Sequence, residues 1–199
     1  MKVKPDLVLD IAGVLSTNCS PSFWRYLSTV YDVRYEELLE FRKEIREELW
    51  KGQITEQDFW LNLQRQIPYL HIESARDQLL SMIIPLPAMK EIPSWSEVAD
   101  IHLLSNHRVE WIEHIINLIQ VYVTSVTISA EVGACKPEIA IYEKTQKYLK
   151  ANGIVLFVDD QEKNFIGAMD LGWDTLLADK EGEWTERVSS LLNRSRISD

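Results

Sequence analysis

Cysteine is scarce in this sequence: Cys19 and Cys135 are the only two among 199 residues. Two distant thiols cannot form the disulfide framework of a small secreted domain, and no CxxC pair is present for metal or redox chemistry. Glycine and proline occur seven times each, and the chain contains neither repeats nor a low-complexity linker. These absences favour buried or idle thiols in a reducing compartment and predict a cytoplasmic location.

Runs of lysine and arginine are also missing, and the formal net charge is -10 with a pI near 4.9. We expect neither nucleic acid nor an anionic membrane as a partner, because both attract basic patches. No apolar segment is long enough to cross a bilayer. If the protein binds an anion, we expect a small molecule whose negative charge is screened by a bound metal ion. With 46% hydrophobic residues, the chain can form one domain with an insertion or two small domains.

The stretch from Val3 to Leu15 contains a short apolar run, residues 7–9, that ends abruptly in Asp10. Such a run predicts a strand buried on both faces of a parallel sheet. An acid at its carboxyl end lies where open α/β sheets bind ligands, although it can also simply end a strand. Gly13 allows a sharp turn and a close approach of backbone N–H groups to a ligand.

The next part of the chain has the spacing of amphipathic helices. Ser20 and Pro21 predict a helix start, and Thr55 to Asp58 form a capping-box-like start. With Ser20 as the N-cap and Pro21 as the first helical residue, the four predicted helices cover residues 21–30, 35–50, 56–67 and 75–84. Trp24, Trp50 and Trp60 are interpreted as helix core, with the alternative that some face a substrate cleft.

From Met89 onward, strand and helix patterns alternate, which is typical of a parallel sheet with helices on both faces. Predicted strands cover residues 101–104, 121–128, 154–158 and 175–178. Predicted helices cover residues 109–119, 138–149, 164–171 and 184–192. We therefore predict an α/β protein with a Rossmann-like three-layer core, residues 1–15 and 87–199, and an inserted helical cap, residues 16–86.

Polar side chains follow three of the predicted strands. Asp10, the pair Ser105-Asn106 and the pair Asp159-Asp160 occupy these positions, and Lys136 lies in a loop before a helix. Because parallel strands end at the same edge, these residues are expected to converge. Carboxylates close together call for a cation, and ligands that are all oxygen suit Mg²⁺. A hydroxyl, backbone amides and a lysine supply the anion-binding half of a phosphate site, so the set points to phosphoryl transfer.

Four segments together resemble the motifs of the haloacid dehalogenase superfamily, in that family's order and spacing. They are residues 10–15 (DIAGVL), 103–106 (LLSN), 136–137 (KP) and 157–160 (FVDD). The insertion resembles the small helical cap of that superfamily. Within it, residues 50–55 with Phe59 and Trp60 are similar to the branch that holds glucose-1-phosphate phosphatases and the N-terminal phosphatase domain of epoxide hydrolases.

The resemblance implies a role for each matching residue. Asp10 would attack phosphorus and form an aspartyl-phosphate. Ser105 and the Asn106 backbone would hold phosphate oxygens, and Lys136 would neutralise the phosphoryl group and the nucleophile. The implied Mg²⁺ ligands are Asp10, the backbone carbonyl of Ala12, Asp160 and, directly or through a second shell, Asp159.

The sequence departs from the family pattern at Ala12, where the usual residue is an aspartate that protonates the leaving group and then activates water. Three consequences are open. The substrate can have a good leaving group, such as an acyl or anomeric phosphate. A water or another group can supply the proton, with Lys43, Lys51 and His71 as candidates. Or the protein can be a slow enzyme that keeps the site for binding phosphate.

The sequence therefore predicts a Mg²⁺-dependent phosphatase acting on a small phosphorylated metabolite, and it leaves the oligomeric state open. The alternatives are a catalytically weak phosphate-binding or regulatory protein, a phosphonatase and a 2-haloacid dehalogenase. A phosphonatase needs a lysine of lowered pKa in the cap, whereas Lys43 and Lys51 lie on an acidic helix. A dehalogenase does not need the acidic pair of residues 159–160. His107 is interpreted as a solvated loop residue, with a substrate contact as the alternative.

Overall fold

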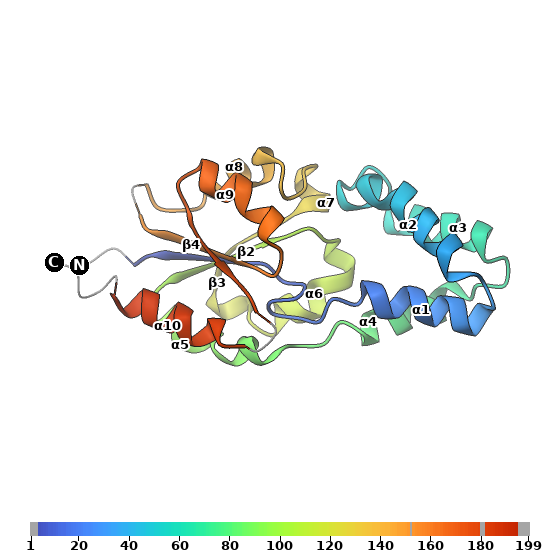
Figure 1. The fold of residues 1–199 in the computed structure, drawn as a ribbon, viewed down its shortest axis with the longest axis horizontal. Coiled ribbons are helices and arrows are strands. Elements are labelled where there is room, and N and C mark those ends of the chain that lie inside the picture. Colours follow the sequence, from blue (N-terminus) through green and yellow to red (C-terminus); the bar gives the residue numbers. More distant parts are fainter. Residues whose placement is uncertain (1–3, 152, 180–181, 195–199) are drawn as a thin grey trace.

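The computed structural model of the protein describes residues 4–151, 153–179 and 182–194. Five parallel strands form one sheet in the order β3-β2-β1-β4-β5 (Figure 1). The strands are β1 (Asp6–Leu9), β2 (Asp100–Ser105), β3 (Val123–Ile128), β4 (Val155–Asp159) and β5 (Asp174–Leu177). Strand β1 lies at the centre, with β2 and β4 as its neighbours. The predicted Rossmann-like α/β core is confirmed.

Helices cover both faces of the sheet because successive side chains of β1 point to opposite sides. Leu7 and Leu9 pack in one apolar cluster with α5 (Ile92–Ser96), α6 (Val109–Asn117) and α10 (Trp184–Arg194). Val8 packs in a second cluster with α8 (Ile139–Gln146) and α9 (Phe165–Asp170). The short helix α7 (Ser129–Val132) and the 3₁₀ turns η1 (Pro87–Lys90), η2 (Gln120–Tyr122) and η3 (Glu162–Asn164) complete the connections.

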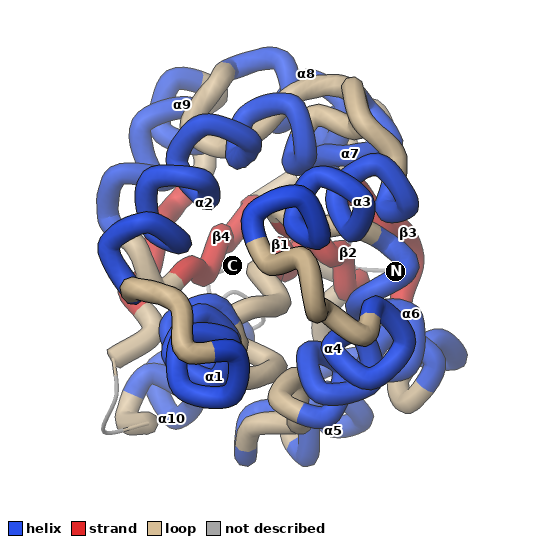
Figure 2. The backbone as a smooth tube through the Cα atoms, turned by 90° about the vertical axis from the view of Figure 1, so that its right-hand side faces the viewer, coloured by secondary structure: helices blue, strands red, loops and turns tan. Residues whose placement is uncertain are grey.

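Four helices lie between β1 and η1 in the chain and gather beyond one end of the sheet (Figures 1 and 2). They are α1 (Ser20–Tyr31), α2 (Tyr35–Trp50), α3 (Glu56–Gln66) and α4 (Ile72–Ser81). Aromatic rings pack edge to face among these helices. The ring centroids of Phe59 and Trp60 are 4.8 Å apart, and those of Phe23 and Trp24 are 5.6 Å apart. Trp24 and Trp60 are therefore helix core, as predicted.

Two predicted helix starts differ from the structure. Helix α1 already includes Ser20, because Phe23 N–H donates to the Cys19 carbonyl (2.9 Å), so Cys19 rather than Ser20 is the N-cap. Helix α4 begins at Ile72, since Ala75 N–H donates to the His71 carbonyl (2.9 Å). Its first turn precedes the first buried apolar residue, and periodicity does not detect such a turn.

Gly52 follows α2 and lies directly against helix α7 of the sheet domain. Its φ of +67° is in the left-handed region, and a Cβ at this position would lie 2.0 Å from the Ala130 carbonyl oxygen. Gly133 has a similar φ of +74°, but a Cβ there would meet nothing within 4 Å. Both glycines therefore need a left-handed backbone conformation, but only Gly52 lies close against another segment of backbone.

We predict that Gly52→Ala destabilises the protein more than Gly133→Ala does. Both substitutions place alanine in a left-handed conformation, at about 1–2 kcal/mol each. Only Gly52→Ala forces two backbones apart, which adds roughly 1–3 kcal/mol. Urea unfolding of the two variants measures the difference, and equal free energies of unfolding would show that the approach of α2 to α7 is not tight.

Candidate active site

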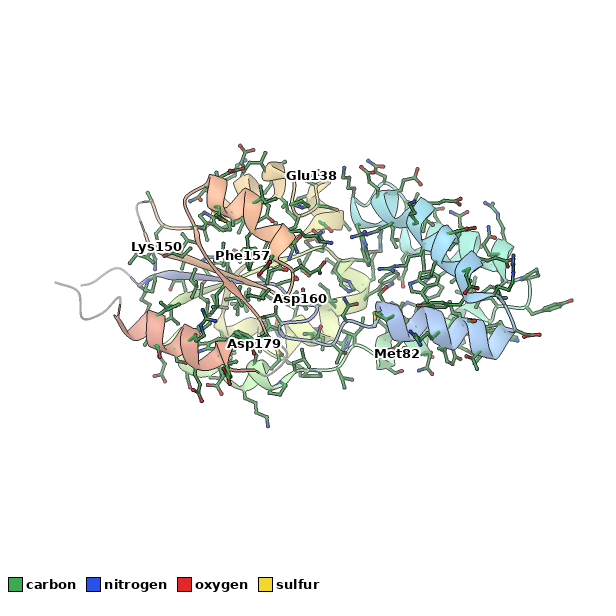
Figure 3. The ribbon with its side chains drawn as sticks, in the orientation of Figure 1. Met82, Glu138, Lys150, Phe157, Asp160 and Asp179 are labelled. Carbon is green, nitrogen blue, oxygen red and sulfur yellow. The ribbon has the colours of Figure 1, made fainter. Side chains whose placement is uncertain are left out.

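The polar residues that follow the strands meet at the end of the sheet facing the four helices. Acidic ligand atoms of Asp10, Asp159 and Asp160 all lie within 4.8 Å of one another. The Lys136 ammonium lies 3.0 Å from Asp10 Oδ1 and 2.6 Å from Asp159 Oδ2. Figure 3 shows Asp160 at this end of the sheet. Adjacent positions of β1 and β4 in the sheet bring the acids together, and β2 adds Ser105.

The two oxygens of Asp10 have different surroundings. Oδ1 accepts hydrogen bonds from Ile11 N (2.7 Å) and Ser105 Oγ (2.8 Å), in addition to the contact with Lys136. Oδ2 accepts no hydrogen bond from any residue within the described ranges. The side chain is therefore held firmly by one oxygen, and the other is available to a ligand.

Burial raises the pKa of Asp10 to about 7, although Lys136 and Ser105 act in the opposite direction. Burial also disfavours the charged form of Lys136, but Asp10 and Asp159 outweigh it, so the pKa of the ammonium is raised. Burial raises the pKa of Asp160 as well. One ammonium cannot balance three carboxylates, so the site favours a further positive charge.

Lys136 is fully committed to this network. Its ammonium donates to the Leu104 carbonyl (3.0 Å) as well as contacting Asp10 and Asp159. The Asn106 side chain fixes the backbone of the same residue, because its Nδ2 donates to the Lys136 carbonyl (2.8 Å) and its Oδ1 accepts from Lys136 N (2.7 Å). The Asn106 side chain is thus occupied, and only its backbone N–H, which has no partner among the described residues, can reach a phosphate oxygen.

Gly13 makes the predicted turn, with φ of +90°, for a reason that the sequence did not show. A Cβ at Gly13 would lie 2.3 Å from Asp160 Oδ2, so the glycine makes room for that carboxylate. Its N–H donates to the Ser16 carbonyl (2.7 Å) and is not available to a ligand. The half-buried Asp160 is held by one donor, the Gln161 side chain at 3.2 Å.

Asp159 is more tightly engaged than Asp160. Its Oδ1 accepts from Gln161 N (2.9 Å) and Asn164 Nδ2 (2.8 Å), and its Oδ2 accepts from Lys136. By contrast, Asp10 Oδ2 and the Ala12 carbonyl accept no hydrogen bond from described residues. These oxygens and Asp160 form a donor set of the kind that Mg²⁺ prefers, so the residues present fit this ion.

A cavity of about 210 Å³ opens onto Asp10, Ala12 and Lys136. Two of the four helices contribute side chains to its wall: Ser20 comes from α1, and Arg42, Arg46 and Trp50 come from α2. Neither arginine was predicted to line a site, because the helix that carries them is rich in glutamate. Their spacing of four residues on a helix otherwise rich in glutamate was the only available signal.

His107 also lines this cavity, and its interpretation as a solvated loop residue was wrong: only 5% of the residue is exposed. Its ring lies 5.2 Å from that of Trp50, and Nδ1 lies 3.2 Å from the Arg108 carbonyl oxygen, which can only accept. Burial lowers the pKa of His107 to about 4. The imidazole is therefore neutral near pH 7, with Nε2 as an acceptor.

Nothing in the cavity wall replaces the acid that is missing at Ala12. Among the described residues that line the cavity, Asp10 is the only carboxylic acid. Lys51 forms ion pairs with Glu138 (2.9 Å) and Glu47 (2.7 Å), and hydrogen bonds to these carboxylates raise its pKa. His71 is exposed and does not line the cavity.

Several polar contacts hold α2 and α3 against the sheet domain. Arg108 donates to the Ile54 carbonyl (2.7 Å), and Trp111 Nε1 donates to Glu56 (2.8 Å). The pair of Lys51 with Glu138, which is labelled in Figure 3, joins α2 to the segment before α8. The cavity wall formed by α2 is therefore fixed relative to the strand ends.

The comparisons with solved structures show that the chain has the fold of haloacid dehalogenase family enzymes. It is similar to a predicted hydrolase of this family from Porphyromonas gingivalis, with 24% identity, a TM-score of 0.78, and coverage of 96% of this chain and 98% of that one.

Two further solved structures extend the comparison. A magnesium complex of a family enzyme from Bacteroides thetaiotaomicron shares 20% identity over 93% of this chain and 98% of that one, with a TM-score of 0.79. The L-2-haloacid dehalogenase of Xanthobacter autotrophicus shares 18% identity over 98% of this chain and 88% of that one, with a TM-score of 0.61. No protein-family model and no curated protein matches the sequence. None of the described helices has the length and apolar character that a bilayer crossing requires.

We predict that Mg²⁺ raises the melting temperature, and that it does so more strongly at about pH 8 than at about pH 6. A ligand that binds only the folded state stabilises it. Since the pKa of Asp10 is raised to about 7, the proton competes with the cation below that pH and leaves above it. Thermal denaturation with and without Mg²⁺ at both pH values measures the effect.

The matched variants are Asp160→Asn and Asp170→Asn. Asp160→Asn should abolish most of the Mg²⁺-dependent shift. Asp170, which is exposed on α9, serves as the control, so Asp170→Asn should keep the full shift. An equal shift in both variants would place the cation elsewhere.

Proposed function

We propose that this protein is a Mg²⁺-dependent phosphatase of the haloacid dehalogenase superfamily that hydrolyses a small phosphorylated metabolite. The observation that carries the proposal is the arrangement of Asp10: one oxygen is fixed by three donors, and the other is free at the floor of a cavity. The fold and the magnesium complex of a similar enzyme support it. We further propose that residues 16–86 form a cap that selects the substrate. Membership of the sugar-phosphatase branch remains a prediction.

In the proposed reaction, the Asp10 carboxylate attacks phosphorus and the bond from phosphorus to the ester oxygen breaks, which leaves an aspartyl-phosphate and an anionic leaving group. Water then hydrolyses the aspartyl-phosphate to inorganic phosphate and restores the carboxylate. The backbone N–H of Asn106 would hold a phosphate oxygen. The Ser105 hydroxyl donates to Asp10 Oδ1 in this structure and would have to turn away from it to hold another phosphate oxygen. A Mg²⁺ ion held by Asp10, Asp160 and the Ala12 carbonyl would supply charge neutralisation. Lys136 keeps its charge next to the attacking side chain.

Ala12 favours a second candidate function, a phosphate-binding or regulatory protein with little turnover. General acid–base assistance is typically worth about 10²–10⁴-fold in rate, and the described cavity wall has no carboxylic acid to replace it. The raised pKa of the paired Lys51 opposes a phosphonatase, which needs a neutral lysine. A 2-haloacid dehalogenase would release chloride from 2-chloropropionate without Mg²⁺.

We predict that the protein hydrolyses acetyl phosphate in the presence of Mg²⁺ and that Asp10→Asn reduces kcat at least about 10³-fold, because the nucleophile is lost. Release of inorganic phosphate is the measurement, with Asp170→Asn as the control. Tight binding of Mg²⁺ and phosphate without turnover on a broad substrate panel would favour the second candidate instead.

We also predict that Ala12→Asp restores proton donation to the leaving group. It should raise kcat/KM by about 10²-fold or more on alkyl phosphates, which are poor leaving groups, and have little effect on acetyl phosphate. Ala12→Asn introduces a side chain of the same shape as Ala12→Asp but without an acidic proton, so it should not raise kcat/KM on either substrate. Equal gains on good and poor leaving groups would contradict leaving-group protonation as the function that this site lacks.

A further inference from the structure

Two arginines of α2 face the cavity that contains the proposed nucleophile. Arg42 and Arg46 lie four residues apart, so they are neighbours on one side of the helix. Both line the cavity of about 210 Å³ that also contacts Asp10 and Lys136. Four cationic side chains therefore line the cavity: Lys136 and Lys163 from the sheet and its loops, and the two arginines from α2.

Neither guanidinium group has an acidic partner among the described residues. Three other arginines are paired with acids, Arg34 with Glu37, Arg76 with Glu56 and Arg108 with Glu110. Arg25 and Arg65 contact Tyr35 and Asn62 instead, and neither lines the cavity. Glutamates are abundant on α2, yet Glu47 pairs with Lys51 rather than with either arginine. Like charges four residues apart on a helix repel one another. A bound anion would therefore stabilise these two neighbouring guanidinium groups.

The surroundings of Arg42 strengthen this requirement. The residue is partly buried, and burial followed by the charge of Arg46 lowers its pKa. Trp50 and the uncharged His107 form the wall between the two cationic regions, and neither competes for the guanidinium groups. An acidic group of a ligand would meet both guanidinium groups without displacing any protein contact.

We propose that the Arg42–Arg46 pair binds a second acidic oxyanion of the substrate, a carboxylate or a further phosphate. The substrate class is then a small phosphate ester with an anionic group at its other end. This inference rests on the proposed phosphatase function and specifies its substrate. Guanidinium groups suit both oxyanions, because their N–H donors match carboxylate and phosphate oxygens in pairs.

A second cavity of about 280 Å³ adjoins the first and supports this class of substrate. It shares Arg46, Trp50 and Lys136 with the first cavity and adds Lys43 and Lys51 at its rim. Glu47 and Glu138 line this cavity too and pair with Lys51. Lys43 and Arg46 have no acidic partner among the described residues, so they supply the positive charge at this rim although the whole chain carries a net charge of -10. A local positive potential of this kind steers anions to the site despite the overall repulsion.

The test is competitive inhibition of 4-nitrophenyl phosphate hydrolysis by the Mg²⁺-loaded protein. Three inhibitors are compared: ethyl phosphate, phosphoglycolate and ethane-1,2-diol bisphosphate. The first has one anionic group, the second adds a carboxylate and the third adds a phosphate. We expect a Ki at least about 10-fold lower for one of the two doubly anionic ligands than for ethyl phosphate. The ligand with the lower Ki identifies the preferred oxyanion.

The ratio of the Ki of ethyl phosphate to the Ki of the preferred doubly anionic ligand should fall close to 1 in Arg42→Gln and in Arg46→Gln. Arg46→Lys should keep part of this ratio, because lysine retains the charge but loses the paired N–H donors. Arg34→Gln is the matched control: it removes a guanidinium group just before α2, outside the cavity, and should keep the wild-type ratio. The proposal is overturned if all three Ki values are similar in the wild type. It is also overturned if the glutamine variants raise the Ki of ethyl phosphate by the same factor as the Ki of the doubly anionic ligands.

Failure of the phosphatase proposal gives a different result. If 4-nitrophenyl phosphate is not hydrolysed, calorimetric titration of the Mg²⁺-loaded protein with ethyl phosphate and phosphoglycolate replaces the kinetic assay. A preference for phosphoglycolate that disappears in Arg42→Gln would support the arginine pair in a binding protein. Equal affinities for ethyl phosphate, phosphoglycolate and, in a third titration, ethane-1,2-diol bisphosphate would contradict the pair itself.

Discussion

The Lys136 ammonium between Asp10 and Asp159 is the interaction on which the site depends. In a buried position, two carboxylates this close repel one another unless a cation lies between them. Lys136 meets this need with contacts to both acids and to the Leu104 carbonyl. The clamp from Asn106 fixes its backbone, so the position of the charge is set before any ligand arrives. The residual negative charge of the cluster is what makes a divalent cation favourable.

The parallel topology explains why so few residues suffice. With β1 at the centre and β2 and β4 beside it, the ends of three strands lie next to one another. Asp10, Ser105 and Asp159 therefore come from distant parts of the chain but from adjacent strands. The connection from β1 leaves the sheet immediately after the nucleophile and forms α1 to α4, which places α2 over the same strand ends. One crossing of the chain thus supplies both the floor and part of the roof of the cavity.

The fold and the strand-end residues could be predicted because both follow from local patterns: short apolar runs, helical periodicity and the polar residue that ends each strand. The polar first turn of α4 could not be predicted from periodicity, since it contains no buried residue. His107 and the arginines of α2 were missed for a different reason. Whether a loop is covered, and which side of a helix faces a cavity, depends on contacts between segments, such as that of Trp50 with His107. The sequence of one segment does not contain this information.

The arrangement favours the binding of negative charge over the transfer of protons. Lys136, Lys163, two arginines and the free backbone N–H of Asn106 give the cavity a positive potential. Ala12 offers no proton, and His107 with a pKa of about 4 cannot donate one near pH 7. In the proposed reaction, electrostatic stabilisation of the transferring phosphoryl group would therefore be the main assistance that the chain itself provides. A substrate that suits such a site brings its own good leaving group, and its remaining charge serves for recognition by the helices above the sheet.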